Sequence, residues 1–164
     1  MIDAAELRSA LGRFATGVTI ITTRSATGEA VGVTASSFNA VSLDPPLILW
    51  SLGRNAFSHP VFEAASHFAV HVLADDQRDL SNRFARASSA KFEGLTTRDG
   101  LGGVPLLGSC AALFECATEH RYDGGDHLIL VGRVLRLGQG PVERPPLLFH
   151  QGRYATLADA TSPA

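Results

Sequence analysis

The segment Gly32 to Phe38 leaves a predicted strand with small, hydroxyl-bearing side chains, and hydroxyl groups continue as far as Ser42. Such a turn offers backbone N–H groups and hydroxyl donors at close range, which suits the polar edge of a planar heterocycle or a phosphate. Turns rich in Ser and Thr also form ordinary loops, because these side chains bond their own backbone. Both interpretations are open for this run.

A second polar segment, Ser51 to Ser58, follows an apolar run and precedes a predicted helix. Its hydroxyl groups, the Arg54 guanidinium and a helix N-terminus can converge on one anion, in a geometry that suits a single phosphate. A plain solvated loop is the alternative, because the chain has no Walker-type sequence and no G-x-G-x-x-G fingerprint. The segment is a candidate anion site without a diagnostic motif.

A histidine, His127, stands directly after Gly125 and Asp126 at the start of a predicted strand. A turn can present its imidazole to a pocket, where a neutral ring hydrogen-bonds a ligand and a protonated ring offsets developing negative charge. Six histidines are present, and a lone histidine is more often structural. His127 is nevertheless the one whose position best favours chemistry.

No Ser/His/Asp order, pair of acids or Cys/His set stands out, so hydrolytic chemistry has no positive support. Cys110 and Cys116 lie six residues apart on one predicted strand, about 20 Å from each other, which is too far for a disulfide. Their spacing does not make a zinc half-site either, and we expect two small core residues and no metal. An enzyme without acid/base machinery can rely on a bound cofactor for its chemistry.

Composition indicates one folded domain. Hydrophobic residues make up 45% of the 164 residues and charged residues 18%, and 14 basic against 16 acidic residues give a net charge of −2. This balance argues against nucleic-acid binding. No basic segment followed by an apolar run begins the chain, and no apolar run approaches the roughly 20 residues that span a bilayer, so we expect no membrane association and a cytoplasmic location. We expect a domain at 1–157 and a flexible tail at 158–164.

The first half of the chain predicts one helix and three strands. Asp3 and Glu6 resemble a capping box before a short amphipathic helix, whose apolar residues follow at helical spacing until Gly17: Leu7, Leu11 and Phe14. A β-hairpin is expected from Val18 to Thr23 and from Ala30 to Thr34, and a third, central strand from Leu47 to Trp50.

The second half predicts short helices and long strands. The expected elements are a helix within 56–65 interrupted near Pro60, a strand at Phe68 to Leu73, a helix capped by Asp75, a functional or mobile loop at 87–108, and two strands, Ala111 to Tyr122 and His127 to Leu137. The residues Asp123 to Asp126 between the last strands suit positive φ angles. Many strands with short inserted helices favour an antiparallel barrel.

Seven short motifs in order resemble the flavin reductase domain family, the reductase partners of two-component flavin-dependent monooxygenases. They are Leu11 to Val18, Gly32 to Phe38, Val41 to Leu47, Phe68 to Val70, Leu80 to Ala85, Gly125 to His127 and Gly152 to Tyr154. The resemblance implies a mainly β protein with short helices, a split β-barrel that forms a homodimer and binds FMN or FAD non-covalently near the subunit interface.

The resemblance also implies roles for individual residues. Flavin ring and ribityl contacts are expected from Thr34, Ala35, Ser36 and Ser37; the phosphate side from Ser51, Leu52, Arg54 and Ser58; and further cofactor-side contacts from Arg83 and Phe84. His127 resembles the family's nicotinamide-side histidine, with Phe149 and Tyr154 shaping the same pocket.

The implied activity is the reduction of flavin by NADH or NADPH through hydride transfer, which supplies reduced flavin to a flavin-dependent monooxygenase. A non-catalytic module that stores flavin or senses redox state is the first alternative. An oxidase of the related pyridoxamine-phosphate barrel type is the second. Gly125 to His127 favours the reductase over the module, because a storage protein has no need for a nicotinamide-facing histidine.

Overall fold

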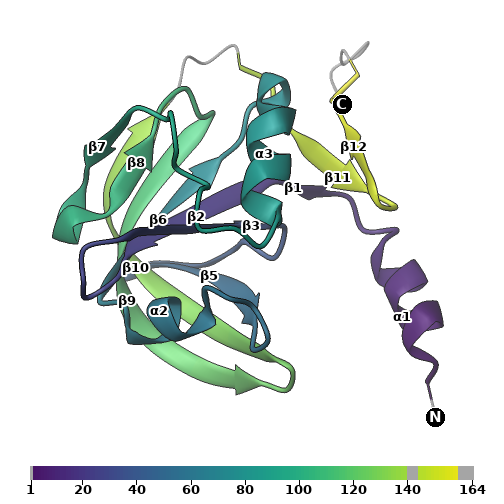
Figure 1. Cartoon of the computed structure of the whole chain (residues 1–164). Coiled ribbons are helices and arrows are strands. Elements are labelled where there is room, and N and C mark those ends of the chain that lie inside the picture. The colour runs from purple at the N-terminus through teal and green to yellow at the C-terminus, as the bar shows by residue number, and fades with distance from the viewer. Residues whose placement is uncertain (1, 140–143, 159–164) are drawn as a thin grey trace.

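The computed structural model describes residues 2–139 and 144–158, and these are mainly β with short helices (Figure 1). The helices are α1 (Ala4–Leu11), α2 (His59–Ala64) and α3 (Arg78–Ala85), with 3-10 turns at Asp75–Gln77 and Leu101–Gly103. The strands are β1 (Thr16–Gly17), β2 (Thr19–Arg24), β3 (Ala30–Ala35), β4 (Asn39–Leu43), β5 (Pro46–Gly53), β6 (His67–Val72), β7 (Thr97–Asp99), β8 (Pro105–Leu107), β9 (Ala112–Gly124), β10 (His127–Gln139), β11 (Leu148–His150) and β12 (Arg153–Ala155). Most of the predicted tail, 159–164, lies outside the described residues.

One seven-stranded sheet, in the order β3-β2-β6-β9-β10-β5-β4, forms the body, and all its pairings are antiparallel. A second sheet, β1-β11-β12, lies beside α3 and pairs a strand from the first part of the chain with two strands from the last part. β7 and β8 form a separate hairpin. The predicted mainly β composition is confirmed.

The β9–β10 hairpin contains the longest strands, and the sequence predicts it from two long strand-like segments joined by the glycine-rich residues Asp123 to Asp126. Gly125 has a φ of 76°, a left-handed conformation that glycine adopts without steric cost. His127 pairs with Gly124 on one side and with Gly53 of β5 on the other. The turn is therefore tied to the end of β5.

The predicted third strand is β5, an interior strand of the sheet that pairs with β10 along one edge and with β4 along the other. Two other local predictions were wrong. α2 begins at His59 and has Pro60 in its first turn, where a missing N–H costs nothing. Asp75 makes no capping hydrogen bond; the side-chain oxygen of Gln77 accepts one from the backbone of Ala74 instead.

The segment 87–108 also differs from the predicted loop, because it contains β7 and β8. Three-residue strands are too short to produce a periodic sequence pattern. The hairpin is fixed to the main sheet by the Thr22 hydroxyl, which donates to the Pro105 carbonyl at 2.7 Å.

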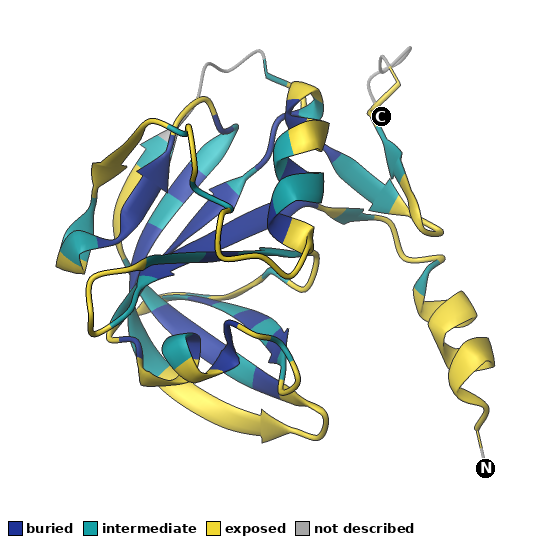
Figure 2. Cartoon of the chain, in the orientation of Figure 1, coloured by how far each residue is buried: buried dark blue, intermediate teal, exposed yellow. Residues whose placement is uncertain are grey.

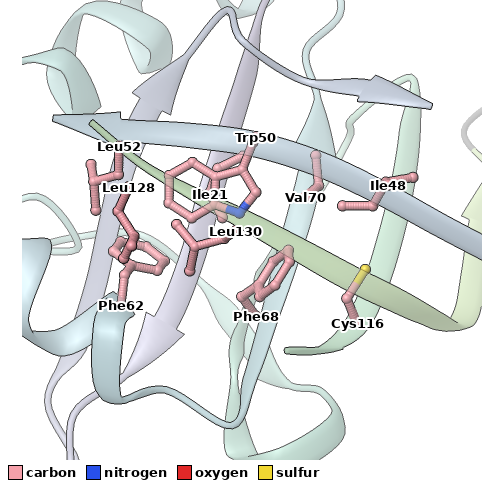
Figure 3. Packing of buried hydrophobic residues seen from close by; sticks show 10 residues of the cluster. All are labelled: Ile21, Ile48, Trp50, Leu52, Phe62, Phe68, Val70, Cys116, Leu128 and Leu130. Carbon is pink, nitrogen blue, oxygen red and sulfur yellow. The ribbon is translucent and has the colours of Figure 1, made fainter. Parts of the chain in front are cut away.

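The main core lies inside the curl of the seven-stranded sheet (Figure 3). Trp50 packs edge-on against Phe62 of α2 and Phe68 of β6, with ring centroids 5.0 and 6.0 Å apart. The remaining members come from β2, β5, β6, β9 and β10: Ile21, Ile48, Leu52, Val70, Cys116, Leu128 and Leu130. Burying these side chains supplies the main stabilisation of the fold.

A second core cluster lies under α3 and includes Phe84, Leu73 and Leu147. A Cβ atom added to Gly32 of β3 would lie 2.6 Å from the Phe84 ring, so only glycine fits at this crossing. Helix and sheet approach each other closely there.

Helix α1 begins where the sequence predicts it, since Asp3 accepts hydrogen bonds from the backbone of Ala5 and Glu6. It ends at Leu11, earlier than the spacing up to Gly17 predicts, and β1 follows at Thr16–Gly17. None of its residues is buried, and it projects from the body (Figure 2). Leu11 and, just beyond the helix, Phe14 are 64% and 76% exposed. The apolar face of this segment has no partner among the described residues.

A fully buried histidine, His71, links β6 to β2 and to the β7–β8 hairpin. Its Nδ1–H donates to the Ile20 carbonyl at 3.0 Å, and its Nε2 accepts from the Leu107 N–H at 3.0 Å. Both ring nitrogens are occupied in the neutral form, and burial lowers the pKa of His71 from 6.5 to about 4.

We therefore expect acidification to destabilise the fold through His71. Between pH 6.5 and about 4 the unfolded chain binds a proton at this residue and the folded chain does not, so the unfolding free energy falls by about 3 kcal/mol as the pH decreases. His71→Gln keeps one donor and one acceptor but cannot titrate, and should flatten this dependence in denaturant unfolding at pH 7, 6 and 5. His120→Gln, at an exposed position, should retain the wild-type slope. An unchanged slope in His71→Gln would contradict the assignment.

Candidate functional site

The hydroxyl-rich run after β3 is partly engaged within the fold. The Thr34 hydroxyl donates to the Ser81 carbonyl of α3 at 2.7 Å, and the Ser37 hydroxyl donates to the Ser51 carbonyl at 3.1 Å. The Ser37 oxygen also accepts from the Ser51 N–H at 2.9 Å. Ser36 is exposed, and its hydroxyl remains available for a ligand.

Ser36 lines a cavity of about 670 Å³ between the α1 segment and β11, which we call the N-terminal cavity. Phe14, Thr16, Phe149 and Gln151 are among its other lining residues. The structure thus brings the predicted ring contact Ser36 together with Phe149, the predicted nicotinamide-side aromatic.

A second cavity of about 550 Å³, here called the α3 cavity, lies where β3, the residues before α2 and the segment after α3 meet. Gly32, Phe57, Ser58, Arg86 and Lys91 are among its lining residues. Of the predicted phosphate-side residues, only Ser58 lines this cavity.

Lys91 is the cation of the α3 cavity that sequence reasoning missed. Its Nζ donates to the Gly32 carbonyl at 3.0 Å and to the Phe84 carbonyl at the end of α3 at 2.8 Å. No carboxylate of the described residues lies within 4.0 Å of it, and burial lowers its pKa. An ammonium group has three donors, so one remains for an anion. The available signal was that Lys91 is the only lysine in the chain.

Arg54 does not line the α3 cavity. Its Nη2 lies 2.8 Å from the Asp123 carboxylate, and its Nε donates to the Gly125 carbonyl at 3.1 Å. This guanidinium is therefore bound to the β9–β10 turn, and a phosphate contact would require it to leave Asp123.

His127 lies at the other end of that turn with its side chain 49% exposed. Its Nδ1 is 2.7 Å from Oδ1 of Asp126, and this imidazole lowers the pKa of the Asp126 carboxyl. When Nδ1–H donates to Asp126, Nε2 of a neutral ring is left as an acceptor for a ligand.

The remaining predicted residues make contacts within the fold and line neither the N-terminal cavity nor the α3 cavity. Leu52 and Phe84 are buried in the two core clusters, so their side chains pack against the interior. Arg83 donates to the carbonyls of Ala90 and Glu93, and thereby holds the segment that carries Lys91. The Tyr154 hydroxyl bonds Ser81 at 2.8 Å and Asn82 at 2.9 Å.

Both cysteines are buried and unpaired, as predicted for small core residues. Burial raises the pKa of Cys110 to about 11 and that of Cys116 to about 12, so both are thiols at neutral pH. The described residues contain no group of three or more His, Cys, Asp or Glu side chains that could hold a metal. They also include no helix long and apolar enough to cross a membrane.

The structure combines an antiparallel sheet, two cavities and an exposed turn that carries a histidine. Comparison with known proteins identifies the class of protein that shares this fold. The family model described as "Flavin reductase like domain" matches residues 11–158, so the chain belongs to this family. The family predicted from the seven motifs is confirmed.

Particular relatives make the similarity specific. The chain is 43% identical over 152 residues to an FMN reductase (NADH), SmoA, of Agrobacterium fabrum, covering 93% of this chain and 85% of the relative. It is 45% identical over 157 residues to the reductase component of a flavin-dependent trigonelline monooxygenase of Acinetobacter baylyi, covering 96% of this chain but only 50% of that relative. The NADH:FAD oxidoreductase SgcE6 of Streptomyces globisporus, solved with NAD and FAD fragments, has a TM-score of 0.91 and 37% identity, covering 98% and 96% of the two chains.

Proposed function

We propose that this protein is an NAD(P)H-dependent flavin reductase that passes reduced FMN or FAD to a separate monooxygenase. The observation that carries the proposal is the family match over residues 11–158, which includes the exposed Gly125–Asp126–His127 turn. Relatives named as reductases with FMN, FAD and NADH support the predicted activity and cofactors. The monooxygenase partner is supported by the relative named as a reductase component, and use of the nicotinamide pool supports a cytoplasmic location.

The α3 cavity fits the phosphate end of a flavin. A partly buried ammonium without a carboxylate partner among the described residues is the group that an anion would neutralise, and Ser58 adds a hydroxyl close by. The small residues of the Gly32 to Ser37 run lead from this cavity toward Ser36 and the N-terminal cavity. We place the flavin phosphate at Lys91 and the flavin ring beside Ser36.

Bound flavin supplies the redox chemistry by accepting hydride from the nicotinamide ring. The protein's own residues bind, orient and exclude water. His127 offers Nε2 to orient the nucleotide, with Asp126 fixing the ring, while Phe149 lines the N-terminal cavity.

A homodimer and a closed split barrel complete the proposal. The strands β3 and β5, which are not neighbours in the sheet order, lie in contact, as closure of a barrel requires. Large apolar side chains are exposed on β4, β10 and α1, including Leu43 at 95% and Leu137 at 66%. A second copy would cover these surfaces.

NADH and NADPH oxidation should be followed with FMN, with FAD and without added flavin. Rapid oxidation that depends on flavin is the expected result. Flavin binding without oxidation would favour a storage or sensor module. The absence of both flavin binding and nicotinamide oxidation would exclude the proposal.

Lys91→Met should weaken FMN binding about tenfold to a hundredfold, because a charge-assisted hydrogen bond contributes about 1.5–3 kcal/mol. Riboflavin, which lacks the phosphate, should bind the variant as it binds wild type. Fluorescence titration measures both affinities. Equal losses for FMN and riboflavin would indicate that Lys91 acts through folding instead.

His127→Ala should raise KM for NADH about tenfold, because one orienting hydrogen bond to the nucleotide is lost. The flavin Kd should remain close to the wild-type value. Steady-state kinetics together with flavin titration separate the two effects, and unchanged kinetics would remove His127 from the mechanism.

Ser36→Leu should weaken flavin binding, because a bulky side chain would fill the N-terminal cavity at the proposed ring position. Thr97→Leu, at an exposed position of β7 that lines neither cavity, serves as the control. Wild-type flavin affinity in Ser36→Leu would overturn the placement of the ring.

A further inference from the structure

A single residue, Arg54, contacts three residues of the β9–β10 turn. Its backbone N–H donates to the Asp126 carbonyl at 2.9 Å, its Nε to the Gly125 carbonyl at 3.1 Å, and its Nη2 to the Asp123 carboxylate at 2.8 Å. In Figure 1 the loop after β5 lies beside this turn. The guanidinium and the backbone of Arg54 thus hold the residues that lead into His127.

The strand register places His127 next to the same loop. Gly53 pairs with His127, and Arg54 is the residue that follows Gly53. A Cβ on Gly53 would lie 3.8 Å from Nε2 of His127, so the imidazole lies over the end of β5. Movement of the β5–α2 loop relative to the turn would therefore displace the ring.

The two carboxylates of the turn take different cationic partners. Arg54 lowers the pKa of Asp123, and His127 lowers the pKa of Asp126. Asp123 and Asp126 are both largely exposed, so each ion pair alone contributes little to stability. The arrangement is better suited to fixing the shape of the turn than to stabilising the fold.

We propose that Arg54 is a positioning residue for His127, which holds the β9–β10 turn in the shape that presents the imidazole to the nicotinamide nucleotide. The inference rests on the proposed reductase function, and it replaces the phosphate role that the sequence predicts for Arg54. It also links the two sides of the site, because the loop that carries Arg54 continues to Ser58 in the α3 cavity.

The chain contains a matched control for Arg54. Arg24 makes similar contacts elsewhere: its Nε donates to the Gly103 carbonyl, its Nη1 donates to the Gly28 carbonyl at 2.8 Å, and its Nη2 lies 2.7 Å from Asp99. The side chains of Arg24 and Arg54 are 31% and 41% exposed. Arg24→Met removes an equivalent surface contact that does not involve the turn.

In Arg54→Met we expect KM for NADH to rise about threefold to tenfold, because the turn loses two side-chain hydrogen bonds and holds the imidazole less firmly. The flavin Kd should stay within about twofold of wild type on the same reasoning. Asp123→Asn should show a smaller effect in the same direction, and Arg24→Met none. Arg54→Lys keeps the charge without the planar fork, so it should also raise KM for NADH. It takes the place of Arg54→Met in the kinetic test if Arg54→Met folds poorly.

Two further measurements test whether Arg54 acts through His127. The ring resonances of His127, assigned by their absence in His127→Ala, should shift in flavin-free Arg54→Met and stay in place in Arg24→Met. In a double-mutant cycle, Arg54→Met should cause no further rise in KM once His127 is alanine.

Three results would overturn the inference: a weakened flavin Kd with unchanged KM for NADH, equal effects of Arg54→Met with and without His127, or unshifted His127 resonances. The first would restore the phosphate role. If the wild-type protein oxidises no nicotinamide nucleotide, the proposed function fails, and the resonances still decide whether Arg54 positions His127.

Discussion

The pairing of β10 along both of its edges is the constraint on which the rest of the structure depends. One edge bonds β9 through a tight glycine turn, and the other bonds β5 in a register that places His127 opposite Gly53. A shift of one residue would turn Leu128 and Leu130 out of the core and move the histidine away from the β5–α2 loop. Core packing and the position of the candidate site are therefore fixed by the same hydrogen bonds.

Close packing of α3 on β3 likewise fixes the residues beside the α3 cavity. Gly32 lets the Phe84 ring approach the strand, and the Lys91 ammonium bridges the Gly32 and Phe84 carbonyls. The cation is held by backbone groups on both elements and does not depend on a carboxylate partner among the described residues. A site built in this way keeps its charge for a ligand.

The sequence was informative where short-range pattern decides the structure, and less so where distant segments meet. Asp3 as a helix cap, the β2–β3 hairpin and the Gly125 turn were all predictable, because their signals lie within a few residues. The motif order also identified the family. Contacts between distant segments were not predictable: Arg54 with Asp123 and Lys91 with Gly32 join residues 69 and 59 positions apart. A cation's type was visible in the sequence, but the group it bonds was not.

The presence of a single lysine has a consequence for the chemical reactivity of the protein. Every other basic side chain apart from histidine is an arginine, which acylating reagents do not modify under mild conditions. Lys91 is the only ε-amine, and its lowered pKa increases the fraction present as the free, nucleophilic amine near neutral pH. Among side chains, an amine-directed label or crosslinker therefore reacts at one position, in the lining of the α3 cavity, without any engineering of the chain.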